Sequence, residues 1–296
     1  MSYKTQETYA SILKMMNNLF GTLNEEYYLN YDKVMEKLHK SKYAITSQKL
    51  IVVVIGSLLK KYKLGDTPKY KDAIEKYKQA IVSYNNTINH IIGENILSKK
   101  EEDKYIDFNQ IIEIHKKLLE DYNKDEEKDA FYNYVLLSLY VLFPPRRLQD
   151  YTKMKIVQKE EKDKNYNYLV YDKNKMKFVF NTYKTSNKYG TQIFEVPTDL
   201  KNILKKWIEM YHKGSFLISN NNGEEVNDYN LSKYITNIIK KYSGIPAGVS
   251  MIRHAYISHI TDNTSLSLNE RQDIANKMAH SIYLQLQYYK GRKKYN

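Results

Sequence analysis

Residues 144–150 read PPRRLQD and directly follow the strongly apolar run FYNYVLLSLYVLF at 131–143. That run predicts a buried helix, and the two prolines end it because proline cannot continue a helix. Asp150 stands three residues after Arg147, one helical turn on, where its carboxylate can hold the guanidinium. We therefore predict a buried helix whose end presents two arginines, one of them oriented by an acid.

Arginine is scarce in this chain, so each arginine is a candidate for a specific role. Of 47 Lys and Arg residues only five are arginine, namely Arg146, Arg147, Arg253, Arg271 and Arg292. Lys, Asn, Ile and Tyr are abundant, as is typical of a very AT-rich coding sequence. Lysine does not form arginine's bidentate fork with a phosphate, so these few arginines indicate possible phosphate contacts.

The chain downstream of the arginine pair mixes β and helical patterns. Short β runs occupy about 153–197, and those at 177–180 and 192–196 flank a polar turn at 185–190, which predicts a hairpin. Ser267 and Glu270 form a capping box, which predicts a helix start. The helices expected in this part cover residues 198–211, 228–242, 249–261 and 268–279.

The first 98 residues are predicted to be helical. Apolar residues recur at helical spacing between Tyr9 and Phe20, and the apolar run at 50–59 is long enough to favour a buried helix over a strand. Thr67-Pro68 starts a further helix, with proline at its first position. The tyrosines that follow at helical spacing are more typical of core packing than of a binding surface.

A polar run at 98–104 indicates a linker. Asp107 and Gln110 then form a capping box that opens a helix through Leu119. These patterns predict a helical domain at 1–98, a linker at 99–106 and a mixed α+β domain at 107–296.

Composition excludes several classes of protein. The hydrophobic fraction of 42% and charged fraction of 27% are those of a globular protein, and no run of 18 apolar residues could span a membrane. The polar first ten residues do not resemble a secretory signal, and the absence of cysteine excludes disulfides, thiol nucleophiles and thiolate zinc sites. We expect a reducing, intracellular setting. The formal net charge of +13 favours a polyanionic partner, most commonly nucleic acid.

Several common active sites are absent from the sequence. There is no phosphate-binding loop and no dinucleotide-binding glycine motif, which argues against nucleotide hydrolysis. His254 and His259 lie five residues apart, off a common helical face, so we do not expect them to share a metal. No acidic cluster suits a two-metal nuclease, although scattered carboxylates leave that possibility open.

What remains is an ordered set of cations followed by a tyrosine: Arg146-Arg147, Lys184, Arg253-His254, His280 and then Tyr289. This order resembles the tyrosine recombinases, the phage-type integrases and resolvases. Residues 145–150, PRRLQD, look like the first arginine box, with Arg147 aligned. Lys184, at the hairpin turn, looks like the β-hairpin lysine, and MIRHAYISH at 251–259 looks like the second arginine box. Ala279-His280 and Tyr289 match the family's Gly-His and its tyrosine nine residues on. Residues 5–20 are similar to the first helix of these enzymes' core-binding domain.

The resemblance implies both a fold and a site. The expected class is mainly α with a small β-sheet or hairpin: an all-helical, DNA-binding core-binding domain followed by an α+β catalytic domain. The catalytic residues that it implies are Arg147, Lys184, Arg253, His280 and Tyr289. Residues with a possible role are Ser250, His254, Lys188, Tyr288 and Arg146.

Two departures from the family pattern stand in this set. Ser250 occupies the position of the histidine three residues before the second arginine, where it either assists proton removal weakly or merely caps the helix that carries Arg253. Ala279 replaces the glycine before the last histidine. Tyr288 precedes Tyr289 directly, so the tyrosine assignment favours Tyr289 without excluding its neighbour.

The implied activity is site-specific breakage and rejoining of DNA strands through a 3′-phosphotyrosyl intermediate, with no metal, ATP or other cofactor. Tyr289 would attack phosphorus, Lys184 would protonate the leaving oxygen, and His280 would contact the phosphate or assist proton transfer. The implied partner is double-stranded DNA, on which the protein would form a homotetramer. The free protein would be a monomer, and no membrane is involved. The protein would come from a viral or mobile element. It would act where its DNA is, in the host nucleus, in the cytoplasm or in a viral factory. Two alternatives stay open, a DNA-relaxing type IB topoisomerase and a catalytically inactive DNA-binding relative.

Overall fold

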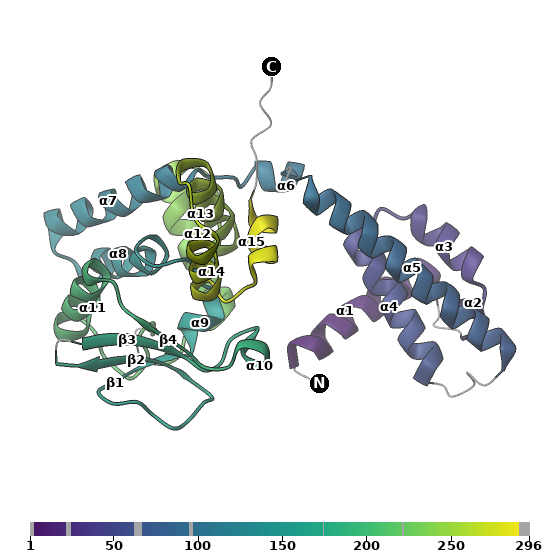
Figure 1. Ribbon diagram of the computed structural model, residues 1–296, viewed down its shortest axis with the longest axis horizontal. Helices are drawn as coiled ribbons and strands as arrows, with labels where there is room; N and C mark the ends of the chain where they lie inside the picture. The colour runs from purple at the N-terminus through teal and green to yellow at the C-terminus, as the bar shows by residue number, and fades with distance from the viewer. Residues whose placement is uncertain are drawn as a thin grey trace, which may run out of the picture. The chain divides into compact units, whose positions relative to one another are not determined.

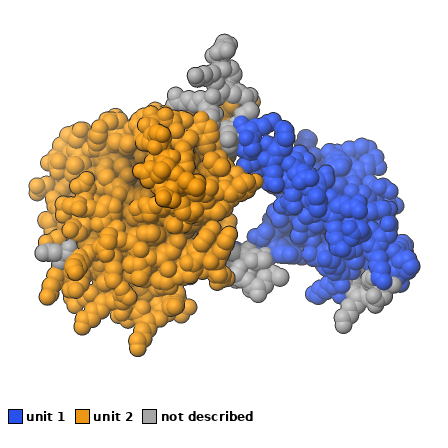
Figure 2. Space-filling view, in the orientation of Figure 1, with its two compact units in different colours: residues 1–94 blue, residues 95–296 orange. Residues whose placement is uncertain are grey.

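The computed structural model describes residues 3–21, 25–61, 67–94, 97–173, 175–220 and 222–289. Helices dominate these residues and one small sheet accompanies them, so the predicted class, mainly α with a small β-sheet, is confirmed. The chain forms two compact units, residues 1–94 and 95–296 (Figure 2).

Unit 1 is helical over its described residues (Figure 1). The predicted helix over 50–59 is confirmed, and its residues Ile51 and Ile55 are fully buried. The tyrosine pattern after Pro68 is core packing, because Tyr77 is fully buried and its hydroxyl donates to the Tyr28 carbonyl (2.8 Å). The helices of unit 1 are α1 (Tyr3–Phe20), α2 (Glu25–Leu29), α3 (Tyr31–His39), α4 (Ile45–Lys61) and α5 (Pro68–Gly93).

Unit 2 combines helices with a four-stranded sheet. Its first half contains α6 (Lys99–Glu102), α7 (Phe108–Asp125), α8 (Lys128–Val141), α9 (Leu148–Thr152), β1 (Met154–Val157), β2 (Asn167–Asp172) and β3 (Lys175–Phe180). Its second half contains α10 (Ser186–Tyr189), β4 (Gln192–Glu195), α11 (Thr198–Met210), α12 (Asp228–Ser243), α13 (Val249–Asn263), α14 (Leu268–Lys277) and α15 (Ile282–Tyr288).

The local start and stop signals read from the sequence are found in the structure. The Asp107–Gln110 capping box opens α7, which continues beyond the expected end at Leu119 to Asp125. α8 ends at Val141, just before the proline pair. The Ser267–Glu270 capping box opens α14. The segment expected to be a linker begins with the short helix α6, which Ser98 caps.

The sheet has the strand order β1-β2-β3-β4. β1 runs parallel to β2, and the other two pairs are antiparallel. The predicted hairpin is β3 and β4, with Phe178 opposite Phe194. Residues on β3 alternate between faces: Phe178 belongs to the main core of unit 2, while Val179 packs in a small cluster with Tyr168. The connection over 181–191 links β3 to β4 and carries Lys184.

No helix among the described residues is long and apolar enough to cross a membrane.

His115 and Ser138 form a buried polar contact between α7 and α8. The Ser138 hydroxyl donates to the Tyr134 carbonyl (2.7 Å), so its oxygen is free to accept a hydrogen bond from His115 Nε2 (2.7 Å). The imidazole also stacks on the Tyr134 ring, with centroids 4.6 Å apart. Burial lowers the pKa of His115 from 6.5 to about 4, so the ring is neutral at pH 7.

We predict that His115 makes the protein less stable in acid. Between its unfolded pKa of 6.5 and its folded pKa of about 4, the unfolded chain binds the extra proton, so stability falls as the pH drops through this window. The loss is up to about 3 kcal/mol. His115→Gln retains a donor for Ser138 and should flatten the pH dependence of the unfolding free energy between pH 7 and 4, measured in denaturant. The exposed His39 offers a matched control, and an equal effect of His39→Gln would contradict this assignment.

Candidate active site

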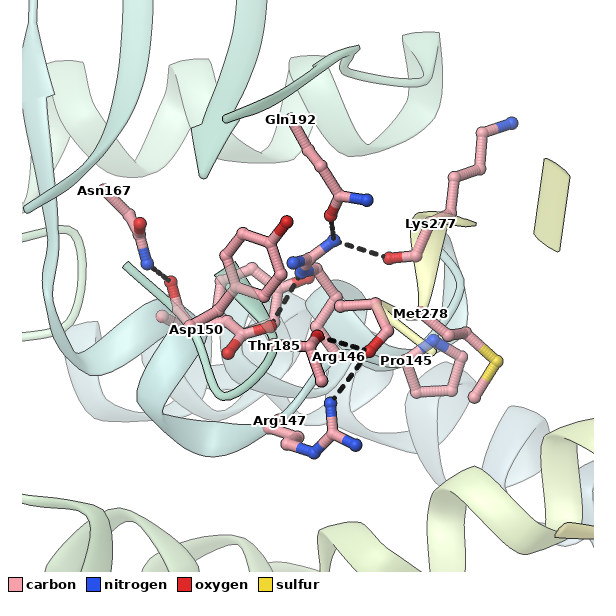
Figure 3. Close-up of polar contacts among 12 residues, drawn as sticks. Pro145, Arg146, Arg147, Asp150, Asn167, Thr185, Gln192, Lys277 and Met278 are labelled. Atoms are coloured by element: carbon pink, nitrogen blue, oxygen red, sulfur yellow. Dashed lines mark hydrogen bonds and ion pairs between the residues drawn. The ribbon is translucent and has the colours of Figure 1, made fainter. Parts of the chain in front are cut away.

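The two arginines after Pro145 point in different directions. Arg146 is fully buried, and its Nε donates to Asp150 Oδ2 at 2.8 Å (Figure 3). The prediction that Asp150 holds Arg147 is therefore wrong. Arg147 is the N-cap of α9 and has extended backbone (φ −76°, ψ 156°), and neighbouring side chains on extended backbone point to opposite sides. Arg146 turns inward to the acid, and Arg147 turns toward the end of α14.

The end of α14 is bound by side chains from distant parts of unit 2. Four successive backbone carbonyls, those of residues 276–279, each accept at least one side-chain hydrogen bond. The donors are Gln192 Nε2 to Asn276 (3.2 Å), Arg146 Nη1 to Lys277 (2.8 Å), Arg253 Nη1 and Nη2 to Met278 (3.4 Å), and Arg147 Nη1 and Thr185 Oγ1 to Ala279 (3.1 and 3.0 Å). The last carbonyls of a helix carry partial negative charge, which favours guanidinium donors.

Ala279 ends α14 in the left-handed conformation, with φ 56°. Its N–H donates to the Asn276 carbonyl and the His280 N–H donates to the Ala275 carbonyl (both 3.0 Å), the two hydrogen bonds of a Schellman turn. Glycine adopts this conformation at little cost, which explains the glycine that the family pattern has here. This turn places His280 and fixes the Ala279 carbonyl against Arg147.

His280 is neutral and has one ring nitrogen available. It is buried, and its Nδ1 lies 3.0 Å from the Ser281 carbonyl, which can only accept, so Nδ1 carries the hydrogen. Burial and the nearby charge of Arg253 lower the pKa of His280 to about 4. Nε2 therefore has a lone pair at pH 7, and it has no hydrogen-bond partner among the described residues. This nitrogen can accept a proton from a neighbouring group.

Arg253 is almost fully buried on α13. Its Nη1 donates to the Pro145 carbonyl (2.5 Å), which ties the second arginine box to the first. Its Nε has no partner among the described residues. Burial lowers the pKa of Arg253, yet a guanidinium stays charged at any ordinary pH.

The tyrosine that joins this cluster is Tyr288, whereas the sequence favoured Tyr289. The Tyr288 hydroxyl lies 3.4 Å from Arg253 Nη2, and its ring stacks on His280 with centroids 5.3 Å apart and an interplanar angle of 14°. Burial alone raises the pKa of Tyr288, but the charges of Arg253, Arg147 and Lys184 outweigh burial, so the pKa lies below 10. A lowered tyrosine pKa favours the phenolate, which is the nucleophilic form.

Tyr289 has a different environment. It follows the last residue of α15 with extended backbone (φ −60°, ψ 129°), so its side chain diverges from that of Tyr288. Its hydroxyl bonds the side chain of Asp262, and this hydrogen bond raises the pKa of Tyr289. The structure therefore brings Tyr288, and not Tyr289, to the arginines.

His254 supports Tyr288 from the backbone side. Its Nδ1 lies 2.8 Å from the Tyr288 carbonyl and so donates to it, and the two rings have centroids 4.6 Å apart. The neighbours Arg253 and His254 thus contact the hydroxyl and the carbonyl of the same tyrosine.

The remaining predicted residues lie at the edge of the cluster or outside it. Lys184 is exposed on the 181–191 connection, and its charge acts on Tyr288. Lys188, on α10, is exposed, with its Nζ 5.2 Å from the Tyr189 ring centre. Ser250 is exposed at the second position of α13. The idea that Ser250 caps this helix is wrong, because Gly248 is the N-cap.

Thr185 and Gln192 were not predicted. Both act on carbonyls more than 80 residues away in the chain, so no local pattern marks them. No group of three or more His, Asp or Glu side chains among the described residues is arranged to hold a metal ion.

We predict that position 279 tolerates glycine but not a branched residue. Ala279→Gly relieves the left-handed strain but adds chain entropy to the unfolded state, so the unfolding free energy should change by no more than about 1 kcal/mol. Ala279→Val places a β-branched residue at positive φ in a fully buried position and should cost several times as much. Thermal unfolding of the two variants tests this, and equal stability would contradict the left-handed turn.

No protein-family model matches the chain, and no curated protein matches it in sequence. Solved structures do match. A dimer of λ integrase residues 75–356 bound to a COC′ core site is 13% identical, with a TM-score of 0.57 over 99% of this chain and 91% of that one. A second λ integrase dimer on a COC′ core site is 16% identical, with a TM-score of 0.52 over 99% and 73%. The site-specific recombinase XerH, bound to difH in a pre-cleavage complex, is 13% identical, with a TM-score of 0.51 over 91% and 68%. At these identities the likeness is one of fold, and the chain has the fold of the tyrosine recombinases.

Proposed function

We propose that this chain is a tyrosine recombinase, which cuts and rejoins DNA through a 3′-phosphotyrosyl intermediate with Tyr288 as nucleophile. The observation that carries the proposal is the environment of the Tyr288 hydroxyl, which lies 3.4 Å from the buried Arg253. Its pKa is lowered although burial opposes the charged form. Proximity to cations is what a phenol of pKa ~10 needs in order to attack at neutral pH.

The arginines suit the charge that develops on a phosphodiester under attack. Arg253 and Arg147 both converge on the end of α14, and their charges act together on Tyr288. Arg147 is only partly buried, so it remains accessible to a phosphate. Guanidinium groups that are held in place before the reaction stabilise the non-bridging oxygens without reorganising during it.

His280 and Lys184 carry out the two proton transfers of the proposed reaction. The Tyr288 oxygen forms a bond to phosphorus as the bond from phosphorus to the 5′-oxygen breaks, and the phenolic proton moves to His280 Nε2. Lys184, exposed on its connection, donates a proton to the departing 5′-oxygen. Attack by a second 5′-hydroxyl reverses the step and joins a new strand, so the exchange needs no ATP.

The partner that we propose is double-stranded DNA. The net charge of +13 favours a polyanion, and the matching λ integrase and XerH structures hold DNA substrates. Strand exchange between two duplexes would use four protomers that swap strands pairwise through a Holliday junction. The matching λ integrase structures are dimers bound to DNA, which supports assembly of the protomers on the substrate.

The first test is covalent trapping on nicked suicide substrates, built from the ends of the DNA element that encodes the protein. Wild type should form a protein–DNA adduct on a denaturing gel, and Tyr288→Phe should form none because it lacks the attacking oxygen. Tyr289→Phe is the matched control and should still form the adduct. An adduct that persists in Tyr288→Phe but disappears in Tyr289→Phe would return the nucleophile to Tyr289. Tight DNA binding without any adduct in wild type would favour an inactive DNA-binding relative.

The second test concerns the arginine fork. Arg147→Lys keeps the charge but loses bidentate geometry, so single-turnover cleavage should slow about 100-fold to 1000-fold while DNA affinity changes little. Arg271→Lys is the matched control, since Arg271 lies in the first half of α14 and its side chain makes no hydrogen bond or ion pair with the described site residues. Cleavage by Arg147→Lys at the wild-type rate would remove Arg147 from the site.

A further inference from the structure

Arg146 and Asp150 are the charged side chains among the described residues whose exposed fraction is 0%. Arg146 Nε donates to Asp150 Oδ2 (2.8 Å), and the Arg146 guanidinium lies 3.7 Å from the Phe180 ring centre. Its Nη1 donates to Gln192 Oε1 (3.1 Å) and to the Lys277 carbonyl (2.8 Å) (Figure 3). The Nε and Nη1 donors of Arg146 are taken by protein groups and its Nη2 is buried, so we assign Arg146 no direct contact with DNA.

A buried ion pair is by itself weak evidence for a stabilising role. Such a pair loses the hydration of both charges, and well-packed apolar residues often serve a fold equally well. The pair is also incompletely satisfied, because Arg146 Nη2 and Asp150 Oδ1 have no hydrogen-bond partner among the described residues. Burial raises the pKa of Asp150, and the charge of Arg146 opposes that shift. The contacts of Arg146 therefore call for a role besides holding the fold together.

The position of the Lys277 carbonyl indicates that role. It is the last carbonyl of α14, directly before the Met278 and Ala279 carbonyls that Arg253 and Arg147 contact, and three residues before His280. Gln192, the other partner of Arg146 Nη1, donates to the Asn276 carbonyl (3.2 Å). Arg146 thus joins α9 and the start of β4 to the turn from which His280 projects.

We propose that Arg146 is a positioning residue for the cleavage site. Its fork, anchored by Asp150, holds the Lys277 carbonyl and so fixes the turn at 277–280 that places His280 and the carbonyl partners of the two catalytic arginines. The inference rests on the proposed function. The two neighbouring arginines then have different roles. Arg147 faces the substrate, and Arg146 holds the turn at 277–280 in place. Lysine cannot replace Arg146, since one ammonium cannot reach the carboxylate, the amide and the carbonyl in a fixed plane.

The deciding experiment replaces the buried pair by apolar residues of similar size. Arg146→Met with Asp150→Leu removes both charges at once and leaves no unpaired charge in the core. Three quantities are measured beside wild type: the unfolding free energy, DNA affinity in a Tyr288→Phe background, and the single-turnover cleavage rate at saturating suicide substrate. We expect stability and affinity close to wild type and a maximal cleavage rate ~100-fold lower, the size of effect that a misplacement of about 1 Å produces. A purely structural role would leave the maximal rate unchanged in a variant that is equally stable.

Arg146→Lys keeps the inference testable if the double variant does not fold. The lysine retains the positive charge that pairs with Asp150. This variant should also cleave more slowly than wild type at saturating DNA, and its affinity for DNA should be unchanged. Wild-type cleavage at saturation by a folded double variant or by Arg146→Lys overturns the positioning role and leaves the proposed function intact. Absence of any adduct in wild type, by contrast, overturns the proposed function itself.

Discussion

The candidate site depends on the hydrogen bonds that three arginine side chains make to three successive carbonyls at the end of α14. Arg146, Arg253 and Arg147 take the carbonyls of Lys277, Met278 and Ala279 in turn. Three of the chain's five arginines therefore meet at one helix end, in a sequence that otherwise uses lysine. A helix terminus presents its carbonyls at fixed separations, and the planar guanidinium, with five donors, can bind such a carbonyl and keep donors for other groups. This requirement gives a physical reason for arginine at these positions in a chain whose other basic residues are mostly lysine.

The same convergence sets the electrostatics around Tyr288. Arg253 and Arg147 bring positive charge into a largely buried place. Asp150 is the one buried carboxylate among the described residues, and it pairs with Arg146. His280 adds no charge because burial and Arg253 hold its pKa near 4. Within the part of the chain that the structure describes, no acid forms an ion pair with Arg253 or Arg147, so the site is positive. Such a site would stabilise a phenolate and a phosphodiester, and its neutral imidazole would serve as proton acceptor, as the proposed function requires.

Much of the fold could be predicted because its signals are local. The capping boxes at Asp107 and Ser267, the proline stop after Phe143 and the hairpin around residues 185–190 each depend on residues close in sequence, and the structure has all of them. β1 and β2 were not assigned individually. Both are short, and β2 is buried along most of its length, so an alternating pattern does not distinguish it. Thr185 and Gln192 were missed for another reason, since their partners are near only after folding.

The two changes to the expected site have a common physical cause. The acid after the first arginine pairs with Arg146 where Arg147 was expected, and the tyrosine in the cluster is Tyr288 where Tyr289 was expected. Each change is of one residue, and each occurs at the end of a helix, where Arg147 caps α9 and Tyr289 caps α15 in extended conformation. At such a boundary the angle between successive side chains changes from about 100° around a helix to nearly opposite directions. A motif spacing counts residues and carries no information on where the helix stops, so it locates such a residue only to within one position. The side chain that reaches the site is then decided by tertiary contacts: the burial of Arg146 against Phe180, and the hold of His254 on the Tyr288 carbonyl.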